Sequence, residues 1–257
     1  MNTTSESGSA PALSVVVPVH NEAQNIVPLI DEIRAACDGA GIDHEIIYVD
    51  DGSRDTTPEV LAEARRTQPR LRTFRHRACA GQSAAVATGV KYARGRIIAT
   101  LDGDGQNDPA DIPALFARLG AAPDADRILV AGWRQKRKDT FIKRLSSKIA
   151  NRVRGGLLGD ATPDTGCGLK VFTRAAFLDM PRFNHMHRFL PALMIRRGGE
   201  VVSVPVNHRP RERGTSKYGM WDRLWVGIVD ILGVIWLNRR RAEPDVEDLN
   251  RPEAGCE

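Results

Sequence analysis

The chain alternates short apolar runs with longer segments in which apolar residues recur every three or four positions. The short runs predict four strands, over 13–19, 45–49, 71–75 and 97–101. The first run is followed by a helical pattern at Ile26, Leu29, Ile30, Ile33 and Cys37. Further helices are expected from Thr57, as N-cap with Pro58 at the first helical position, and over 84–93. This alternation predicts βαβ units and an α/β fold with a mostly parallel sheet flanked by helices.

Polar residues follow the predicted strands at the points where they end. The residues concerned are His20, Asp50, Asp51, Gly81, Asp102 and Asp104. In open parallel sheets ligands bind outside the carboxyl ends of the strands, so we expect these residues to surround one site. No Gly-x-Gly-x-x-Gly follows the first strand, which argues against a dinucleotide enzyme.

The stretch 97–109 carries the most specific candidate chemistry. An apolar run ends at Asp102, and Asp104 and Gln106 follow on a glycine-containing turn. Two carboxylates and an amide oxygen suit Mg²⁺ or Mn²⁺, ions that often keep positions for substrate phosphates. The stretch therefore predicts a site for a metal-bound diphosphate.

Other interpretations of this stretch differ in how well they fit. An EF-hand would need Gly at Asn107 and Glu at Pro113, so a calcium loop is excluded. A phosphatase of the haloacid-dehalogenase type would normally have Thr where Gln106 stands, and its motif would lie near the chain start. A plain Asp/Gly turn, with Asp108 capping a helix near Pro109, stays open.

Composition is that of a folded protein. The chain has 257 residues, 42% of them hydrophobic and 27% charged, enough for one α/β domain with a small appendage. Residues 1–12 are polar and are expected to be disordered; without an apolar core they predict neither a signal peptide nor a membrane anchor. The four cysteines are widely spaced, which suits a reducing compartment. A cytoplasmic catalytic domain is the expectation.

The net charge of +5 is concentrated in a few basic segments. They lie at 134–148, 209–217 and 239–241. This distribution suits an anionic surface or a phosphate ligand. No aromatic and basic recognition pattern supports a nucleic-acid partner, so none is expected.

Several motifs together resemble a known family. Val16-Val-Pro-Val-His-Asn-Glu22, Val49-Asp-Asp-Gly-Ser53 and Leu101-Asp-Gly-Asp-Gly-Gln106 resemble successive signatures of family 2 inverting glycosyltransferases. Later segments are similar to the dolichol-phosphate mannosyltransferase and undecaprenyl-phosphate glycosyltransferase branch, namely Arg144-Leu-Ser-Ser147, Asp164-Thr-Gly-Cys-Gly-Leu-Lys170, His187-Arg-Phe-Leu190 and Arg213-Gly-Thr-Ser-Lys-Tyr218. The resemblance extends from about residue 13 to residue 237.

The resemblance implies a GT-A nucleotide-diphospho-sugar transferase domain over 13–219. It implies metal-dependent, inverting transfer of a hexose of the mannose or glucose type from a nucleotide-diphosphate sugar to a polyprenyl phosphate. Pro18, His20 and Glu22 would then line the nucleotide pocket, Asp50 would accept hydrogen bonds from the base and Asp51 would lie near the ribose. Gly81 is a further donor-site candidate. Asp102, Asp104 and Gln106 would hold Mg²⁺ or Mn²⁺, with Asp104 closest to the diphosphate.

The basic segments would serve the phosphates. The resemblance places a helical pattern over 141–154 at the entrance for the lipid phosphate, with Arg134, Arg144 and Ser146 as acceptor-phosphate ligands. Asp164 and Lys170 would lie near the donor sugar. Arg213, Ser216 and Lys217 would belong to a loop over 209–218 that closes on the diphosphate. A solvated basic helix face and an ordinary surface loop explain the same charges.

The apolar segment 224–237 is too short to span a bilayer. Its 14 residues would make a helix of about 21 Å against a hydrocarbon core of about 30 Å. One stripe collects the apolar side chains Trp221, Leu224, Trp225, Ile228, Leu232, Ile235 and Trp236, and Asp230 falls on the other side. We expect an interfacial helix over 220–241, peripheral on the cytoplasmic membrane face, followed by a disordered tail over 242–257. Docking on the protein's own core or on a homodimer partner is the alternative.

Two other functions stay open from the sequence. A family 2 transferase that acts on a sugar hydroxyl would need an Asp or Glu general base. A catalytically silent lipid- or nucleotide-binding module could use the same fold. The nucleotide also stays open, because Asp50 could bind guanine or uracil and the donor could be GDP- or UDP-linked.

Overall fold

A computed structural model describes residues 10–134, 155–156, 159–160, 162–210 and 220–240, without the side chains of 220–226. Its strands are β1 (Leu13–Val19), β2 (His44–Asp50), β3 (Leu71–Arg75), β4 (Ile97–Thr100), β5 (Ile128–Arg134), β6 (Lys170–Thr173) and β7 (Glu200–Val206). Its α-helices are α1 (Ala23–Gly39), α2 (Thr57–Thr67), α3 (Gln82–Tyr92), α4 (Ile112–Gly120), α6 (Arg174–Leu178), α7 (Leu190–Arg196) and α8 (Met220–Arg239). Short 3₁₀ helices lie at Pro109–Asp111, Ala125–Arg127 and Met186–Arg188.

The strands form one mostly parallel sheet in the order β3-β2-β1-β4-β6-β5-β7. The strands β1 to β4 are parallel to one another, and β5 is parallel to β7. The strand β6 runs antiparallel to both of its neighbours, and its Lys170 pairs with Thr100 of β4. This reversal brings the first residue of β6 to the edge where β1, β2 and β4 end. The predicted α/β architecture is thereby confirmed.

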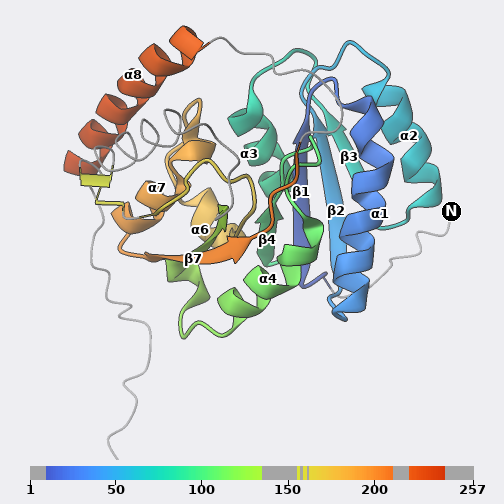
Figure 1. The fold of residues 1–257 in the computed structure, drawn as a ribbon, viewed down its shortest axis with the longest axis horizontal. Helices are drawn as coiled ribbons and strands as arrows, with labels where there is room; N and C mark the ends of the chain where they lie inside the picture. The colour runs from blue at the N-terminus through green and yellow to red at the C-terminus, as the bar shows by residue number, and fades with distance from the viewer. Residues whose placement is uncertain (1–9, 135–154, 157–158, 161, 211–219, 241–257) are drawn as a thin grey trace, which may run out of the picture.

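Helices cover both faces of the sheet, as Figure 1 shows. Alternate residues of the buried strands divide between two apolar cores. Val15 and Val17 of β1 contribute to the core beneath α1, α2 and α4, whereas Val16 contributes to the core beneath α3, α6 and α7. The two layers therefore cover the faces of the sheet, and the residues that follow its strands lie at its edge.

The predicted elements differ in detail from those observed. The helix α3 begins at Gln82 rather than at Ala84. Thr57 is not an N-cap but the first residue of α2, and its hydroxyl accepts a hydrogen bond from the Glu22 N–H at 3.0 Å. Asp108 does cap the 3₁₀ helix at Pro109 by accepting from the Ala110 N–H at 3.1 Å. The turn interpretation therefore holds for Asp108.

The last described helix, α8, contacts the body through one face. Val234 is fully buried, Asp230 Oδ2 lies 3.0 Å from His185 Nδ1, and the Leu237 carbonyl accepts from Arg196 Nε at 3.2 Å. Ile235, expected on the exposed stripe, is half-buried against the core because this face docks on the body. None of the described helices is long and apolar enough to cross a membrane.

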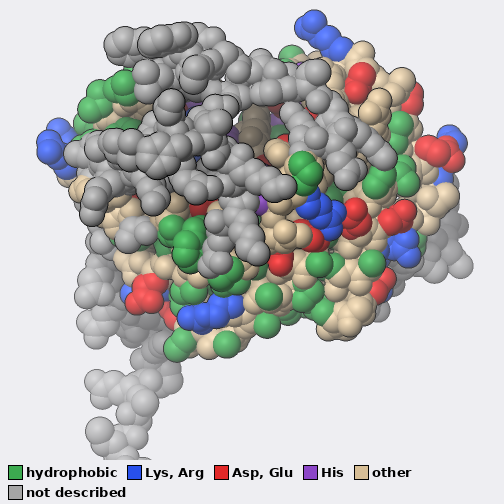
Figure 2. Space-filling model, viewed as in Figure 1, with side chains coloured by type: hydrophobic (Ala, Val, Ile, Leu, Met, Phe, Trp, Pro, Cys, Tyr) green, Lys and Arg blue, Asp and Glu red, His purple; other side chains and the backbone are tan. Residues whose placement is uncertain are grey.

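The opposite face of α8 exposes apolar side chains. Ile228, Val229, Leu232 and Trp236 are 42%, 64%, 60% and 60% exposed. Figure 2 shows hydrophobic side chains over this end of the molecule, while acidic and basic side chains are interspersed over the other described parts of the same view. One face of α8 thus docks on the core, and the other carries an exposed apolar stripe, so each of the two expectations describes one face.

Candidate active site

The carboxyl end of β2 supplies Asp50 and Asp51, which stabilise the loops around them. Asp50 is 1% exposed, accepts from the Ser53 N–H at 2.9 Å and forms an ion pair of 3.0 Å with Arg75. His20, at the end of β1, contacts the Asp51 carbonyl through Nδ1 at 2.8 Å. These contacts bring two of the predicted nucleotide-pocket residues to one edge and give Asp50 a structural role there.

Asp51 holds the loop between β3 and α3. Its carboxylate accepts from the N–H groups of Ala80 and Gly81 at 2.8 and 2.7 Å and contacts His76 Nδ1 at 2.7 Å and Cys79 Sγ at 3.1 Å. Burial by itself would raise the pKa of Asp51, but these hydrogen bonds outweigh it and lower the pKa. The predicted candidate Gly81 is thus positioned by Asp51, and it adopts a positive φ of 93° at the start of α3.

Asp102 follows β4 and has few partners among the described residues. Its Oδ1 accepts from Gln82 Nε2 at 2.7 Å. Burial, reinforced by the charge of Asp104, raises the pKa of Asp102 to about 6. A Cβ added at Gly168 would collide with the Asp102 carboxylate, so only glycine leaves this close approach open.

The geometry around Asp102 fits a hard divalent cation. Asp102 is half-buried, and a carboxylate with a raised pKa gains by pairing with positive charge; a second carboxylate, Asp104, lies two residues along the chain. The described residues contain no group of three or more His, Cys, Asp or Glu side chains that could hold a metal. Asp102, Asp104 and Gln106 therefore stay the predicted ligands, and a cation there would need further oxygen ligands such as those of a substrate.

The turn after Asp102 is tied to the chain segment that follows β7. Asp104 Oδ1 accepts from the Gln106 N–H at 3.1 Å, and Asn107 forms an isolated antiparallel bridge with His208. Arg209 pairs with Glu32 at 2.6 Å and with Asp108 at 2.5 Å. The segment that leads into the predicted 209–218 loop is thereby fixed beside the candidate metal ligands.

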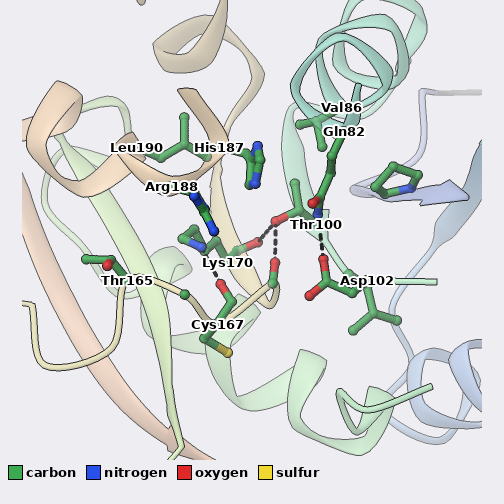
Figure 3. Close-up of a pocket in the computed structure, with 14 residues that line it drawn as sticks. Gln82, Val86, Thr100, Asp102, Thr165, Cys167, Lys170, His187, Arg188 and Leu190 are labelled. Atoms are coloured by element: carbon green, nitrogen blue, oxygen red, sulfur yellow. Dashed lines mark hydrogen bonds between the residues drawn. The ribbon is translucent and has the colours of Figure 1, made fainter. Parts of the chain in front are cut away.

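A cavity of about 180 Å³ lies between α3, the end of β4 and the chain around β6. Its lining includes Pro18 and Asp102 from the predicted site, with Gln82, Cys167, Gly168, Lys170, His187 and Arg188. Figure 3 shows Asp102 and Gln82 on one side of this cavity and Lys170 and Arg188 on the other. The candidate metal ligand and two cationic side chains thus face the same space.

Arg134 and Asp164 form a buried ion pair. The Arg134 guanidinium donates from Nε and Nη2 to the two carboxylate oxygens at 2.6 and 2.8 Å. Their side chains are 11% and 8% exposed. This bidentate pair joins the end of β5 to the loop before β6, so both predicted site residues have a structural contact that the sequence did not reveal.

His187 and Ser83 connect two distant segments above the cavity. The Ser83 hydroxyl lies 2.7 Å from His187 Nδ1 and accepts from the His187 N–H at 3.2 Å. Burial, together with the charges of Lys170 and Arg188, lowers the pKa of His187 to about 3. The imidazole is therefore neutral and holds the 186–188 turn against the start of α3.

The remaining predicted residues fall into two groups. Glu22 precedes α1 and accepts from Asn25 Nδ2 at 2.7 Å, near the end of β1. Five residues lie outside the described part of the chain, namely Arg144, Ser146, Arg213, Ser216 and Lys217. For all the predicted site residues, the assigned roles in binding or catalysis stay predictions.

Sequence reasoning gave no role to Gln82, Ser83, His187, Arg188 or Gly168. The motif 187–190 was part of the family resemblance, but nothing in it indicated a partner 104 residues away. The same holds for Gly168, whose importance lies in its closeness to Asp102. Only the tertiary arrangement reveals these contacts.

Comparison with known proteins defines the class. Residues 14–180 match the family described as glycosyl transferase family 2. The chain belongs to this family and is a glycosyltransferase.

Two proteins of known activity are similar to this chain in sequence. The chain is 38% identical over 239 residues to a dodecaprenyl-phosphate galacturonate synthase from Rhizobium johnstonii, covering 90% of this chain and 69% of the relative. It is 34% identical over 209 residues to an undecaprenyl-phosphate 4-deoxy-4-formamido-L-arabinose transferase from Edwardsiella ictaluri, covering 81% of this chain and 63% of the relative. The second match thus spans less than two thirds of that protein.

Solved structures share the fold. A mannosyl-3-phosphoglycerate synthase from Rubrobacter xylanophilus matches with a TM-score of 0.66 at 17% identity, over 95% of this chain and 79% of that one. A mannosyltransferase from Pyrobaculum calidifontis, solved with GDP-Man and Mn²⁺, matches with a TM-score of 0.64 at 21% identity, over 91% and 66%. These likenesses support the GT-A-like architecture.

Proposed function

We propose that this glycosyltransferase moves a sugar from a nucleotide diphosphate to a polyprenyl phosphate, with inversion at the anomeric carbon. The observation that carries the proposal is the cavity at the end of β4, where the half-buried carboxylate of Asp102, which has few partners among the described residues, faces cationic side chains. The names of both relatives describe sugars attached to, or transferred to, a polyprenyl phosphate. A cation-bound donor diphosphate would account for Asp102 and Asp104, and anionic groups of the substrates would account for the cationic side chains that face them.

The acceptor supplies its own nucleophile in this reaction. A phosphate monoester has a second pKa near about 6, so it is largely a dianion at neutral pH and needs no strong general base. Asp102 is the one carboxylate among the described residues that line the cavity, and Asp164 is bound by Arg134. This supports a phosphate acceptor over a sugar hydroxyl, which would need a carboxylate base facing it.

Asp102, Asp104 and Gln106 would hold Mg²⁺ or Mn²⁺. The ion would neutralise charge on the departing diphosphate. Gln82 positions the Asp102 carboxylate through a hydrogen bond, and Asp51 holds Gly81, the residue before Gln82. The predicted Arg213 and Lys217 would add charge at the diphosphate, and Arg134 and Arg144 would orient the acceptor, so that positioning provides most of the rate enhancement.

The exposed face of α8 would bring the enzyme to its lipid acceptor. Ile228, Leu232 and Trp236 lie on this face, and exposed Arg239 and Arg240 follow at its end. Apolar side chains next to cationic ones suit the interface of a membrane with anionic head groups, to which each charge contributes about 1 kcal/mol. Peripheral attachment at the cytoplasmic face is therefore part of the proposal.

Transfer of labelled sugar tests the proposed function directly. The full chain is incubated with GDP- and UDP-linked sugars and Mn²⁺, and with either undecaprenyl phosphate or a glycan acceptor. The proposal expects label in the lipid phosphate fraction. Label that appears only in glycan would instead support the hydroxyl-acceptor alternative, and donor binding without turnover would support a silent binding module.

Membrane attachment is tested separately with vesicles that contain anionic lipid. Changing Leu232 and Trp236 together to Ser should weaken vesicle binding about 10-fold, because two exposed apolar side chains are lost. Val27→Ser, at an apolar position on α1 that is 49% exposed, serves as the matched control. If vesicle binding is unchanged and a dimer becomes a monomer, the face is a dimer contact and this part of the proposal fails.

A further inference from the structure

Lys170 places a buried ammonium group in the wall of the active-site cavity. It is 3% exposed and lines the cavity together with Asp102. Its Nζ donates to the Cys167 carbonyl, which uses one of its three N–H donors. Since no other hydrogen bond of this ammonium occurs among the described residues, the group can bind a further acceptor from inside the cavity.

The fold aims Lys170 at the site by reversing β6. Lys170 pairs with Thr100, the last residue of β4, and Asp102 follows two positions later. The antiparallel strand thus presents its first side chain at the edge where the parallel strands present their ends. Lys170 is consequently held on a strand of the sheet rather than on a loop, which makes it a precise binding group.

Arg188 adds a second permanent cation to the same wall. It ends the short helix Met186–Arg188, lines the cavity and is exposed to solvent. The neighbouring His187 is neutral, because burial lowers its pKa to about 3. Figure 3 shows Arg188 and Lys170 on the side of the cavity that lies away from Asp102.

The described residues that line the cavity carry more positive than negative charge. Asp102 is the one acid among the described lining residues, against the two cations Lys170 and Arg188. Once Asp102 binds a divalent cation, its charge no longer compensates that of Lys170. Asp164 also attracts this ammonium, but its carboxylate is bound by Arg134, and burial lowers the pKa of Lys170. A ligand that brings a carboxylate to this wall would stabilise the charged ammonium.

We propose that the donor sugar is a uronic acid, whose carboxylate binds Lys170 with Arg188 beside it. This inference rests on the proposed function, and it replaces the mannose- or glucose-type hexose expected from the sequence by an acidic sugar. A hydroxymethyl group at C6 could accept a single neutral hydrogen bond from Lys170, whereas a carboxylate offers a charge-assisted one. We expect the acidic sugar to bind about 10- to 100-fold more tightly than its neutral counterpart.

The test compares donors that differ only at C6. The affinity of the full chain with Mn²⁺ is measured by calorimetry for three pairs: UDP-galacturonate and UDP-galactose, UDP-glucuronate and UDP-glucose, and GDP-mannuronate and GDP-mannose. The inference expects the uronate to bind at least about 10-fold more tightly in one pair. UDP and GDP without sugar provide the reference for binding that does not involve the sugar.

Variants assign the preference to the proposed residues. Lys170→Met should bring the uronate-to-hexose affinity ratio close to one, and Lys170→Arg should retain part of it. Lys91→Met, the same change in the last turn of α3, is the matched control and should leave the ratio unchanged. Circular dichroism verifies folding, and Arg188→Ala, at an exposed position, should lower the ratio even if Lys170→Met does not fold.

Different failures would have different meanings. Equal affinity for both members of every pair would overturn the inference and leave the proposed function intact. The same conclusion would follow if Lys170→Met weakened both members equally, since Lys170 would then serve the diphosphate or Asp102. If no nucleotide sugar binds at all, the proposed function itself fails, and the inference fails with it.

Discussion

Two pairs of aspartates lie at the ends of β2 and β4, the strands on either side of β1, and the two pairs have different hydrogen-bond partners. The Asp51 carboxylate accepts from four groups of the loop before α3, those of His76, Cys79, Ala80 and Gly81. Asp50 is bound by Arg75 and the Ser53 N–H. Asp102 has Gln82 as its side-chain donor among the described residues. The hydrogen bonds lower the pKa of Asp51, whereas burial and the charge of Asp104 raise that of Asp102 to about 6.

This difference separates a structural role from a chemical one. A carboxylate whose oxygens are already bonded stabilises the loops that donate to it. A buried carboxylate that lacks such donors is destabilised as an anion, and a cation would relieve that cost. The sequence motifs Asp50-Asp51 and Asp102-x-Asp104 look alike in composition, yet the structure predicts that they respond differently to the same substitution.

The largest expected effect follows Asp104→Asn. Removing one carboxylate from the proposed metal site should lower turnover by about 10²- to 10³-fold, because the charge that balances the diphosphate complex is lost. The free energy of unfolding should change by less than about 0.5 kcal/mol, since Asp104 is not in the core. Sugar transfer and urea unfolding are measured on the same preparation. Wild-type turnover in the variant would remove Asp104 from the site.

Asp51→Asn should lower stability, whereas Asp104→Asn lowers mainly turnover. An amide cannot accept from the Ala80 and Gly81 N–H groups as the carboxylate does, and its NH₂ group opposes one of these donors. We expect the free energy of unfolding to fall by about 2 to 3 kcal/mol, measured in urea. If the variant is as stable as the wild type but does not bind nucleotide, Asp51 is a ligand-binding residue, as the family resemblance implied. The proposed difference between a structural Asp50–Asp51 pair and a metal-binding Asp102–Asp104 pair would then be wrong.

The half-buried His187 predicts a pH dependence of the free energy of unfolding. Its pKa in the folded chain is about 3, against an ordinary 6.5, so between these values the unfolded chain binds the additional proton. Stability should therefore fall as the pH falls below 6.5, by up to about 1.4 kcal/mol per pH unit from this residue. Unfolding curves from pH 7 to 4.5 should have a shallower pH slope in His187→Asn. An identical slope would show that His187 is charged in the folded protein.

The smallest expected effect concerns Gln82. Gln82→Ala removes the hydrogen bond to Asp102, and we expect transfer to slow by about 3- to 10-fold, because the carboxylate is positioned less well. Gln68→Ala, between the end of α2 and the start of β3, provides a glutamine control at the opposite edge of the sheet. A loss as large as that of Asp104→Asn would mean that Gln82 itself contacts the donor.

The sequence predicted those features that depend on local pattern. Apolar runs identified β1 to β4 within about one residue of their ends, because a buried parallel strand needs continuous apolar residues. The same runs placed His20, Asp50, Asp51, Asp102 and Asp104 at one edge, which follows from parallel order alone. The family resemblance added the class of enzyme, which the comparisons confirm.

Features that depend on distant partners could not be predicted. The antiparallel direction of β6 places Lys170 beside Thr100, and no local signal reveals that direction. The approach of Gly168 to Asp102 and the bond between Ser83 and His187 likewise need the packed fold. Docking of α8 through Val234 and Asp230 depends on side chains of other elements, so the sequence left its two faces undecided.

Binding of Mn²⁺ tests the central claim most directly. The free Mn²⁺ signal in electron paramagnetic resonance is titrated with the full chain in the presence of UDP or GDP, for the wild type, Asp102→Asn and Asp51→Asn. The account predicts that the wild type and any folded Asp51→Asn protein bind the ion with the nucleotide, whereas Asp102→Asn loses this binding. Undiminished Mn²⁺ binding by Asp102→Asn would contradict the assignment of the metal site to the end of β4.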